Sequence, residues 1–339
     1  MRRSPARITV SLGASPQMKA ATRLLLIAAM LALAPATFAQ SWPTKPVKLI
    51  IPFPPGGASD YVGRVIGQVL SDAWGQPVVM ENRGGAGATV GTSAVAKAPP
   101  DGYTLLMGVN AGIVIAPHVY SQLNYDPLKE LVPAAGFAVS PMVMVVPSDL
   151  PVKSVAEFIT LARAKPGSVS FASSGSGALP HLTTEKFRLA AKLEMLHVPY
   201  KGSGPALVDL LAGRTQMMMD IIVSALPMVQ SGKLRALAVT TAKRDAALPN
   251  VPTMIEAGLP GFTAEQWYAV FAPTGTPPAI LARIQSDLAR AMQSAELRDN
   301  FSKRGADAAF VEGARFAETV KKDSAQWAEI VRITGARAD

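Results

Sequence analysis

Short apolar runs alternate with helical patterns through most of the 339-residue chain, and this alternation constrains the fold more than any other feature. The run VKLII at residues 47–51 is followed by apolar residues at helical spacing between residues 61 and 70. Continuous apolar strands separated by helices are typical of parallel sheets that are covered on both faces. We therefore expect an α/β fold with a core of parallel strands.

The alternation occurs in two successive units. In the first unit we expect strands at residues 47–51, 78–80 and 104–107. In the second unit we expect strands at residues 142–146, 169–172, 195–198, 216–219 and 234–239. An aromatic-containing run at 267–272 and two further helices, the last at about 315–330, then return the chain to the first unit. We expect residues 40–140 and 252–339 to form lobe 1 and residues 141–251 to form lobe 2, with a ligand cleft between them.

The first 39 residues have the pattern of a secretory signal. Five basic residues and no acid precede or flank the apolar run at 24–34, and they are Arg2, Arg3, Arg7, Lys19 and Arg23. The run has 11 residues, whereas a membrane span needs roughly 20. We expect cleavage between Ala39 and Gln40 and a soluble periplasmic protein, and Met18 is an alternative start.

The composition excludes several classes of function. The chain has no cysteine, so it has no disulfide scaffold, cysteine-bound metal or thiol nucleophile. Its three histidines form no metal-binding motif, and we expect neither a metal nor a cofactor. Without the first 39 residues, 28 basic and 24 acidic residues remain, a net charge of +4. No basic run interleaved with aromatic residues remains, so we expect no nucleic-acid partner.

Three loops rich in glycine or serine follow predicted strands and lead into predicted helices, at residues 52–60, 81–91 and 173–181. Glycine lets the backbone approach a ligand closely. The start of a helix also offers free amides and about half a unit of positive charge, which attract anions. Open α/β sheets bind ligands at the carboxyl ends of their strands. We therefore expect an anion clamp between two lobes, built mostly from backbone amides.

Two enzyme-related alternatives fit less well. The glycines at residues 85–91 are spaced G-x-G-x-x-x-G, which is not the dinucleotide-binding fingerprint, and no phosphate-binding loop motif occurs. The nucleophile elbow of serine hydrolases is absent, because Ser174 precedes the sequence Gly-Ser-Gly. We expect no catalytic residues. A periplasmic hydrolase that uses Ser176 and His181 stays as an alternative, as does an orphan sensory binding protein.

Five motifs together resemble one known family. They are TKPVKLIIPFPPGGASD at 44–60, ENRGGAG at 81–87, DGYTLL at 101–106, VPYKG at 198–202 and VPTM at 251–254. They resemble the Bug (Bordetella uptake gene) or TctC family, the periplasmic solute-binding proteins of tripartite tricarboxylate transporters. The resemblance covers nearly all of the chain after the predicted signal.

The resemblance implies a two-lobed periplasmic-binding-protein fold of type II, a Venus flytrap, in which each lobe is a central sheet flanked by helices. It implies a small carboxylate ligand, which could be a di- or tricarboxylate, an amino acid or an aromatic acid, held by backbone amides and bridging waters. Inner-membrane transporter subunits are the expected partners, and we expect a monomer.

The candidate ligand-binding residues come from the three loops and from positions that the resemblance adds. They are Phe53, Pro55, Gly56, Gly57, Ala58, Asp60, Ala86, Gly87, Ala88, Thr89, Asn110, Ser173, Ser174, Gly175, Ser176, Gly177, His181, Lys201, Gly202 and Asp220. Phe53 is expected to form an apolar wall, and the Thr89 hydroxyl and the amides of the first loop to donate to a carboxylate. Asp60 stabilises the start of a helix or accepts from the ligand, and Asp220 caps a loop or faces the pocket; both alternatives stay open.

Overall fold

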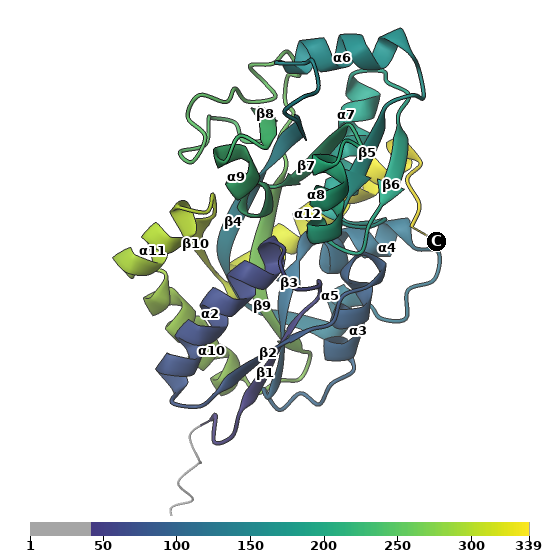
Figure 1. The fold of residues 1–339 in the computed structure, drawn as a ribbon. Helices are drawn as coiled ribbons and strands as arrows, with labels where there is room; N and C mark the ends of the chain where they lie inside the picture. Colours follow the sequence, from purple (N-terminus) through teal and green to yellow (C-terminus); the bar gives the residue numbers. More distant parts are fainter. Residues whose placement is uncertain (1–41, 339) are drawn as a thin grey trace, which may run out of the picture. The chain divides into compact units, whose positions relative to one another are not determined.

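The computed structural model describes residues 42–338, and the residues from Pro43 onward form one compact unit. Figure 1 shows this unit, with its strands in the interior and its helices outside. The predicted signal, its cleavage site after Ala39 and the alternative start at Met18 lie outside the described residues. No helix among residues 42–338 is both long enough and apolar enough to cross a membrane.

The first sheet has the strand order β2-β1-β3-β9-β4-β10. β1 (Val47–Ile51) pairs in parallel with β2 (Val78–Asn82) and β3 (Thr104–Val109), as predicted. β9 (Glu265–Pro273) lies antiparallel to both β3 and β4, and β10 (Asp307–Glu312) lies antiparallel to β4. The expected parallel strands are present as β1, β2 and β3, but the sheet is mixed: β9, β4 and β10 add antiparallel pairs because the chain re-enters the sheet from the other lobe.

The long strand β4 (Leu131–Pro147) belongs to both sheets. Its first part pairs with β9, and its last part pairs with β7 (Met217–Ile221) and β8 (Leu234–Val239). The second sheet continues from β7 through β5 (Ser170–Ser173) to β6 (Leu196–Pro199). In this sheet, β7 and β8 each pair with β4 in antiparallel, whereas β5 pairs with β7 and with β6 in parallel.

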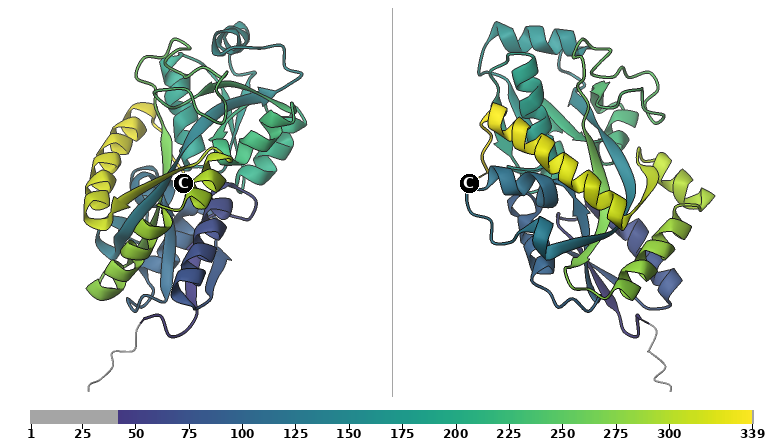
Figure 2. Two further views of the ribbon diagram at one scale, coloured as in Figure 1. Left: turned by 90° about the vertical axis from the view of Figure 1, so that its left-hand side faces the viewer. Right: turned by 180° about the vertical axis from the view of Figure 1, so that it is seen from behind.

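Helices cover both faces of each sheet. Around the first sheet lie α2 (Ala58–Trp74), α3 (Thr89–Ala96), α4 (Ala116–Val119), α5 (Pro127–Glu130), α10 (Pro278–Ala291) and α11 (Ala295–Ser302), with the short turns η1 (Ala86–Ala88) and η2 (Ala111–Ile115). Around the second sheet lie α6 (Val155–Ala164), α7 (Leu179–Ala190), α8 (Ser203–Leu211) and α9 (Ile222–Gln230). The last helix, α12 (Gly313–Thr334), runs across the back of the molecule and contacts both β4 and α7 (Figure 2).

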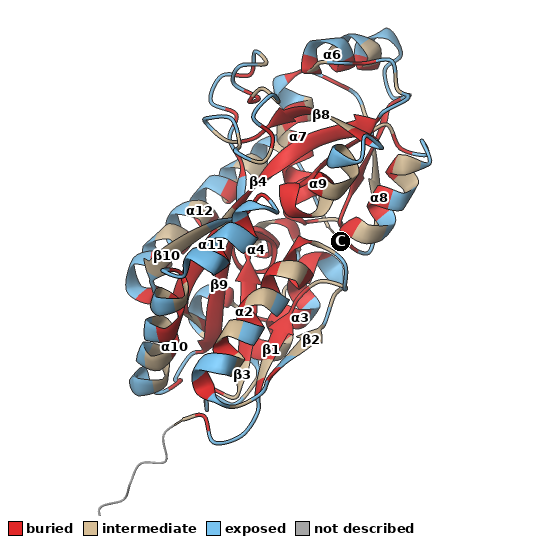
Figure 3. Cartoon of the chain, turned by 60° about the vertical axis from the view of Figure 1, so that its left-hand side comes forward, coloured by how far each residue is buried: buried red, intermediate tan, exposed pale blue. Residues whose placement is uncertain are grey.

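The strands form the core, and Figure 3 shows the central strands buried between partly exposed helices, whereas the edge strands β2, β6 and β10 are partly exposed. Tyr268 and Phe271 of β9 are among the largest fully buried side chains in the first lobe. In the second lobe, Val143 and Val145 of β4 pack with Met218 and with apolar residues of α8 and α9. Burying each such side chain stabilises the fold by about 1.5–3 kcal/mol.

The chain passes between the two sheets at β4 and again near residue 264. The Thr240 backbone N–H donates to Met142 O at 3.0 Å, and the Ala264 N–H donates to Thr240 O at 3.1 Å, so these strands are tied together at the crossing. Residues 252–254 still bond to β8, since the Met254 N–H donates to Val239 O at 2.8 Å. The division into lobes, expected at 140/141 and 251/252, stays our proposal, and these bonds favour a second boundary near residue 264.

Candidate functional site

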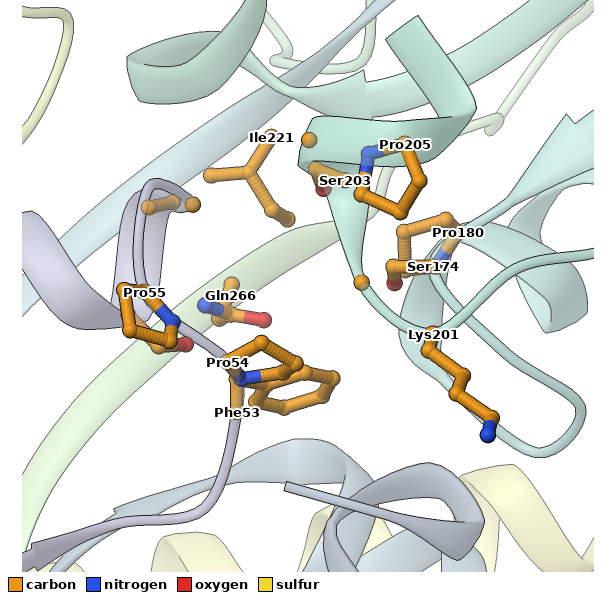
Figure 4. Close-up of a pocket in the computed structure, with 15 residues that line it drawn as sticks. Phe53, Pro54, Pro55, Ser174, Pro180, Lys201, Ser203, Pro205, Ile221 and Gln266 are labelled. Atoms are coloured by element: carbon orange, nitrogen blue, oxygen red, sulfur yellow. The ribbon is translucent and has the colours of Figure 1, made fainter. Parts of the chain in front are cut away.

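Two adjoining cavities lie between loops of the two lobes, with empty volumes of about 400 and 970 Å³ that include space open to solvent. They share Phe53, Pro54, Ser174, Lys201 and Gly202, and we call them together the cleft. The remaining residues of its lining are Pro55, Gly57, Ala58, Ser59, Gly84, Gly85, Ala86, Gly87, Ala88, Tyr120, Gly175, Ser176, Pro180, Pro199, Tyr200, Ser203, Gly204, Pro205, Ile221, Gln266 and Ala338. Figure 4 shows Phe53 and Pro55 on one side of the smaller cavity, opposite Ser174, Ser203 and Pro205.

Four helices begin at the cleft. Ala58 starts α2, Pro180 lies in the first turn of α7, Ser203 starts α8, and Ile221 is the N-cap of α9. Each helix start carries free amides and about half a unit of positive charge. Lys201 is the only cationic side chain among the residues that line the cleft, and no acidic side chain is among them. The cleft therefore has the electrostatic character of an anion site.

Asp60 and Asn82 hold the first loop in position from behind. The Asp60 carboxylate accepts from the Gly56 N–H at 3.0 Å, from Asn82 Nδ2 at 3.0 Å and from the Arg64 guanidinium at 2.9 Å. Asn82 Nδ2 also donates to Phe53 O at 2.9 Å. Burial raises the pKa of Asp60, but the bonds from Arg64, Gly56 and Asn82 outweigh this and lower it overall. Asp60 is 7% exposed and is not part of the cleft lining, which favours its loop-stabilising role.

The start of α2 contacts the second lobe directly. The Ala58 backbone N–H donates to Ser224 Oγ of α9 at 2.8 Å. The hydroxyl of Ser224 therefore satisfies one of the amides that we expected to meet the ligand. Helix α9 was not predicted from the sequence, and neither was this contact.

The second loop has an unusual backbone conformation. Ala86, Gly87 and Ala88 have φ angles of 44°, 58° and 80°, in the left-handed region that non-glycine residues rarely adopt. Such strain persists only where the surroundings impose it, and it is concentrated at functional sites. A Cβ atom on Gly87 would lie 2.6 Å from Ser176 O, so the second and third loops touch across the cleft.

Two stacked histidines support the third loop. The His181 and His197 rings lie 4.0 Å apart at an interplanar angle of 9°. His197 Nε2 lies 2.7 Å from Ser173 Oγ, which also accepts from the Gly175 N–H at 3.2 Å. The Gly177 N–H donates to His181 Nδ1 at 3.2 Å. Each imidazole thus fixes one end of the loop, and the described residues contain no hydrogen bond between Ser176 and His181.

The environment keeps both imidazoles neutral. Burial lowers the pKa of His181 to about 3, with a further contribution from His197, and burial lowers the pKa of His197 to about 4. His181 is 5% exposed and is not part of the cleft lining. A base that is already bonded to a backbone amide and is this hard to protonate gives no support to the hydrolase alternative.

Asp220 lies at the end of β7, next to the cleft lining. It is fully buried, and its Oδ1 accepts from Ser203 Oγ at 2.8 Å. Burial raises its pKa to about 7, although the bonds from Ser203 and the Ile221 backbone act in the opposite direction. Its Oδ2 has no hydrogen-bond partner among the described residues.

The structure brings most of the candidate residues together. Phe53, Pro55, Gly57, Ala58, Ala86, Gly87, Ala88, Ser174, Gly175, Ser176, Lys201 and Gly202 line the cleft. Gly56, Asp60, Thr89, Ser173, Gly177, His181 and Asp220 belong to the same loops or helix starts but are not part of the lining. Asn110 lies elsewhere: its Oδ1 accepts from the Trp267 N–H at 3.1 Å, and it borders a separate cavity beside α12.

Sequence reasoning missed Ser203, Ile221, Ser224 and Gln266. A signal for Ser203 was present, because it stands between two glycines after a strand and at the start of a helix, like the three loops that were recognised. Ile221 and Gln266 belong to buried strands and have no such signal around them.

Comparisons with known proteins show which family this chain resembles. Residues 62–336 match the family model TctC, described as the tripartite tricarboxylate transporter family receptor. The chain is 38% identical to protein BugT of Bordetella pertussis, over 93% of this chain and 98% of that one. A Rhodopseudomonas palustris protein with adipate has a TM-score of 0.85 and 35% identity, over 87% of this chain and 99% of that one.

MatC from Rhodopseudomonas palustris with bound malate has a TM-score of 0.81 and 32% identity, over 86% of this chain and 100% of that one. The two-lobed α/β fold that the resemblance implied is confirmed by these structures. The chain therefore belongs to the Bug/TctC family of tripartite tricarboxylate transporter receptors.

Proposed function

We propose that this chain is a periplasmic receptor that closes its two lobes on a small carboxylate and delivers it to inner-membrane transporter subunits. The observation that carries the proposal is the convergence of four helix starts on a cleft whose lining contains Lys201 and no acid. The larger of the two cavities is within the size range of small-molecule sites. Relatives with adipate and with malate support a carboxylate as the ligand.

Binding in this proposal depends on backbone amides and bridging waters more than on side-chain charge. Closure around the ligand excludes bulk water, which strengthens each amide contact because the local dielectric constant falls. The two crossings near Met142 and Ala264 are where the lobes would rotate, since they join the sheets and lie outside the cleft lining.

A thermal-shift screen tests the proposal. The full chain is exported and recovered from the periplasm of the host, then mixed with dicarboxylates, citrate, amino acids, aromatic acids and the uncharged amides of these acids. A ligand present at 100 times its dissociation constant stabilises the folded state by about 2.7 kcal/mol. We expect stabilisation by one class of acid and none by the matching amides. Stabilisation by amides alone, or by nothing in the panel, contradicts a carboxylate receptor.

The substitutions Gly57→Asp and Gly57→Asn test the site itself. Gly57 is the N-cap of α2 with φ −97°, and a Cβ there would meet only Ser203 Cβ at 3.9 Å, so both variants fit. Asp and Asn are both good N-cap residues, so neither weakens the helix. They differ in charge alone. We expect Gly57→Asp to lose carboxylate binding in calorimetry and Gly57→Asn to retain most of it, and equal affinity in the two variants contradicts an anion site at α2.

A further inference from the structure

Ser203 lines the cleft, and its hydroxyl is bonded to a buried acid. It is 9% exposed, it stands at the start of α8, and its hydroxyl donates to Asp220 Oδ1 at 2.8 Å. A serine hydroxyl has one hydrogen to donate and two lone pairs to accept with. While that hydrogen is bonded to Asp220, Ser203 offers the cleft only lone pairs. Lone pairs repel a carboxylate oxygen and attract a donor such as an ammonium or hydroxyl group.

The negative charge of ionised Asp220 has few hydrogen bonds to stabilise it. It is fully buried, and Oδ2 has no hydrogen-bond partner among the described residues. The buried hydroxyl of Tyr268 also has no partner in hydrogen-bond geometry there; burial raises the pKa of that phenol, and the Asp220 carboxylate adds to the rise. A buried carboxylate with one free oxygen is expensive to keep charged, so taking up a proton costs little.

No neighbouring charge holds Asp220 ionised. The strands β4, β5 and β7 around it carry no other charged side chain, and α9 carries none. On β8, Arg235 donates to the backbone oxygens of residues 148, 150 and 152. On α8, Asp209 bonds to Tyr200 and Arg214.

The ionisable groups of α7 are also occupied elsewhere. His181 accepts from the loop, Glu185 pairs with Arg188, and Lys186 donates to Thr263 O. On β9, Glu265 lies near Asp307, which leaves the Tyr268 phenol as the titratable side chain that interacts with Asp220. Protonation of Asp220 is therefore set by its burial and by what occupies the cleft.

We infer that Asp220 and Ser203 form a proton-dependent selector in the cleft, in which a proton taken up by Asp220 turns the Ser203 hydroxyl toward the ligand. The proton comes from solvent. The protonated Asp220 carboxyl donates a hydrogen bond to Ser203 Oγ, and the serine hydroxyl then donates its own hydrogen to a ligand carboxylate. Protonated Asp220 thus selects an anionic group at this position, and ionised Asp220 selects a donor. The inference rests on the proposed function, because it deepens the description of the same carboxylate site.

Calorimetry with adipate and with malate measures the proton directly. The protein recovered from the periplasm is titrated at each pH in phosphate and in Tris, and the buffer dependence of the enthalpy gives the protons taken up per ligand bound. The pH runs from about 6.5 to 8.5, where both probes are ionised. Because the pKa of Asp220 is about 7, we expect uptake to approach one proton at the alkaline end. The dissociation constant should rise about tenfold per pH unit there.

Two variants test whether Asp220 is the group that takes up the proton. Asn in Asp220→Asn has the shape of the protonated acid and can donate to Ser203 Oγ, so we expect no proton uptake and a dissociation constant that is independent of pH. Asp323→Asn is the control, because burial raises the pKa of Asp323 too, but this acid bonds to Trp267 outside the cleft. We expect Asp323→Asn to take up as many protons per ligand bound as the unmodified protein does.

The outcomes separate the inference from the proposed function. If a probe binds with no proton uptake and the same affinity at every pH, the selector is wrong and the carboxylate receptor stands. If Asp220→Asn keeps the pH dependence of the unmodified protein, another group carries the proton and the assignment fails. If neither these probes nor any acid of the screening panel binds at any pH, the proposed function fails and the selector fails with it.

Discussion

The backbone N–H of Ala58 donates to Ser224 Oγ across 2.8 Å, and this bond joins α2 of the first lobe to α9 of the second. An amide at a helix start needs an acceptor, and here a residue of the opposite lobe provides it. In the lobe closure that we propose, this bond forms only in the closed arrangement. It would therefore stabilise that arrangement independently of any ligand.

Removing this acceptor with Ser224→Ala should favour the open arrangement. One such hydrogen bond contributes about 1 kcal/mol, which changes an open-to-closed ratio about fivefold. We expect small-angle scattering to give a larger radius of gyration for ligand-free Ser224→Ala than for the unmodified protein, and equal radii with a saturating ligand. Ser231→Ala is the matched control, since Ser231 Oγ bonds only within the exposed end of the same helix. Identical radii for the two ligand-free variants would show that the bond does not bias closure.

Several strands were predictable because each is a short, mostly apolar run. The predictions at 47–51, 104–107 and 234–239 are confirmed as β1, β3 and β8, the second with two more residues at its end. The 17 residues of β4 were predicted only in part, because Pro133, Gly136 and Pro141 indicate breaks. Register shifts near Pro133 and Gly136 accommodate them.

Two elements, β10 and α9, were not predicted from the sequence, each for its own reason. β10 has only the four-residue apolar run AAFV within DAAFVE and lies half-exposed at a sheet edge, and a run this short does not distinguish a strand from a helix segment. α9 is apolar along most of its length and contains Pro227, which argues against a helix. Its place against β4, β7 and β8 is set by tertiary packing, and the contact of Ser224 with Ala58 could not be predicted from local sequence.

Some residues of the candidate site were predictable because glycines mark them. Glycine positions such as Gly57 and Gly87 signal a close approach, and the structure places both in the cleft lining. The roles of polar side chains were less predictable, because they depend on partners far away in the sequence. His181 stacks on His197 and Asp220 bonds to Ser203, and neither pairing follows from spacing.

Closure should be sensitive to one added methyl group at Gly87. A Cβ atom there would lie 2.6 Å from Ser176 O, and the φ of +58° adds backbone strain of about 1 kcal/mol. We expect Gly87→Ala to weaken ligand binding at least about tenfold, because the second and third loops can no longer meet. Gly213→Ala has similar strain at φ +70° but no atom within 4 Å, and it should bind normally. Equal affinities in calorimetry would mean that the contact between the loops is dispensable.

Neutralising Lys201 should matter little. Figure 4 shows its side chain extending away from Ser203, and Lys201 is exposed. An exposed charge contributes about 1 kcal/mol or less and is screened by salt. We therefore expect Lys201→Gln to raise the dissociation constant by less than about tenfold, well below the effect of Gly57→Asp. A loss of about 100-fold in calorimetry, recovered by lowering the ionic strength, would instead make Lys201 the principal anion ligand.

His181 should contribute a loss of stability in mild acid. Its pKa falls from 6.5 to about 3 on folding. Between these two pH values the imidazole is protonated in the unfolded chain and neutral in the folded protein. The contribution is therefore absent above about pH 6.5 and destabilises the fold as the pH drops toward 3, by up to about 1.4 kcal/mol per pH unit. The oxygen of Asn in His181→Asn can still accept from Gly177 but does not titrate. Urea unfolding at pH 7 and pH 5 should show a smaller stability loss in His181→Asn than in the unmodified protein, and equal losses would mean that this imidazole is protonated in the folded state.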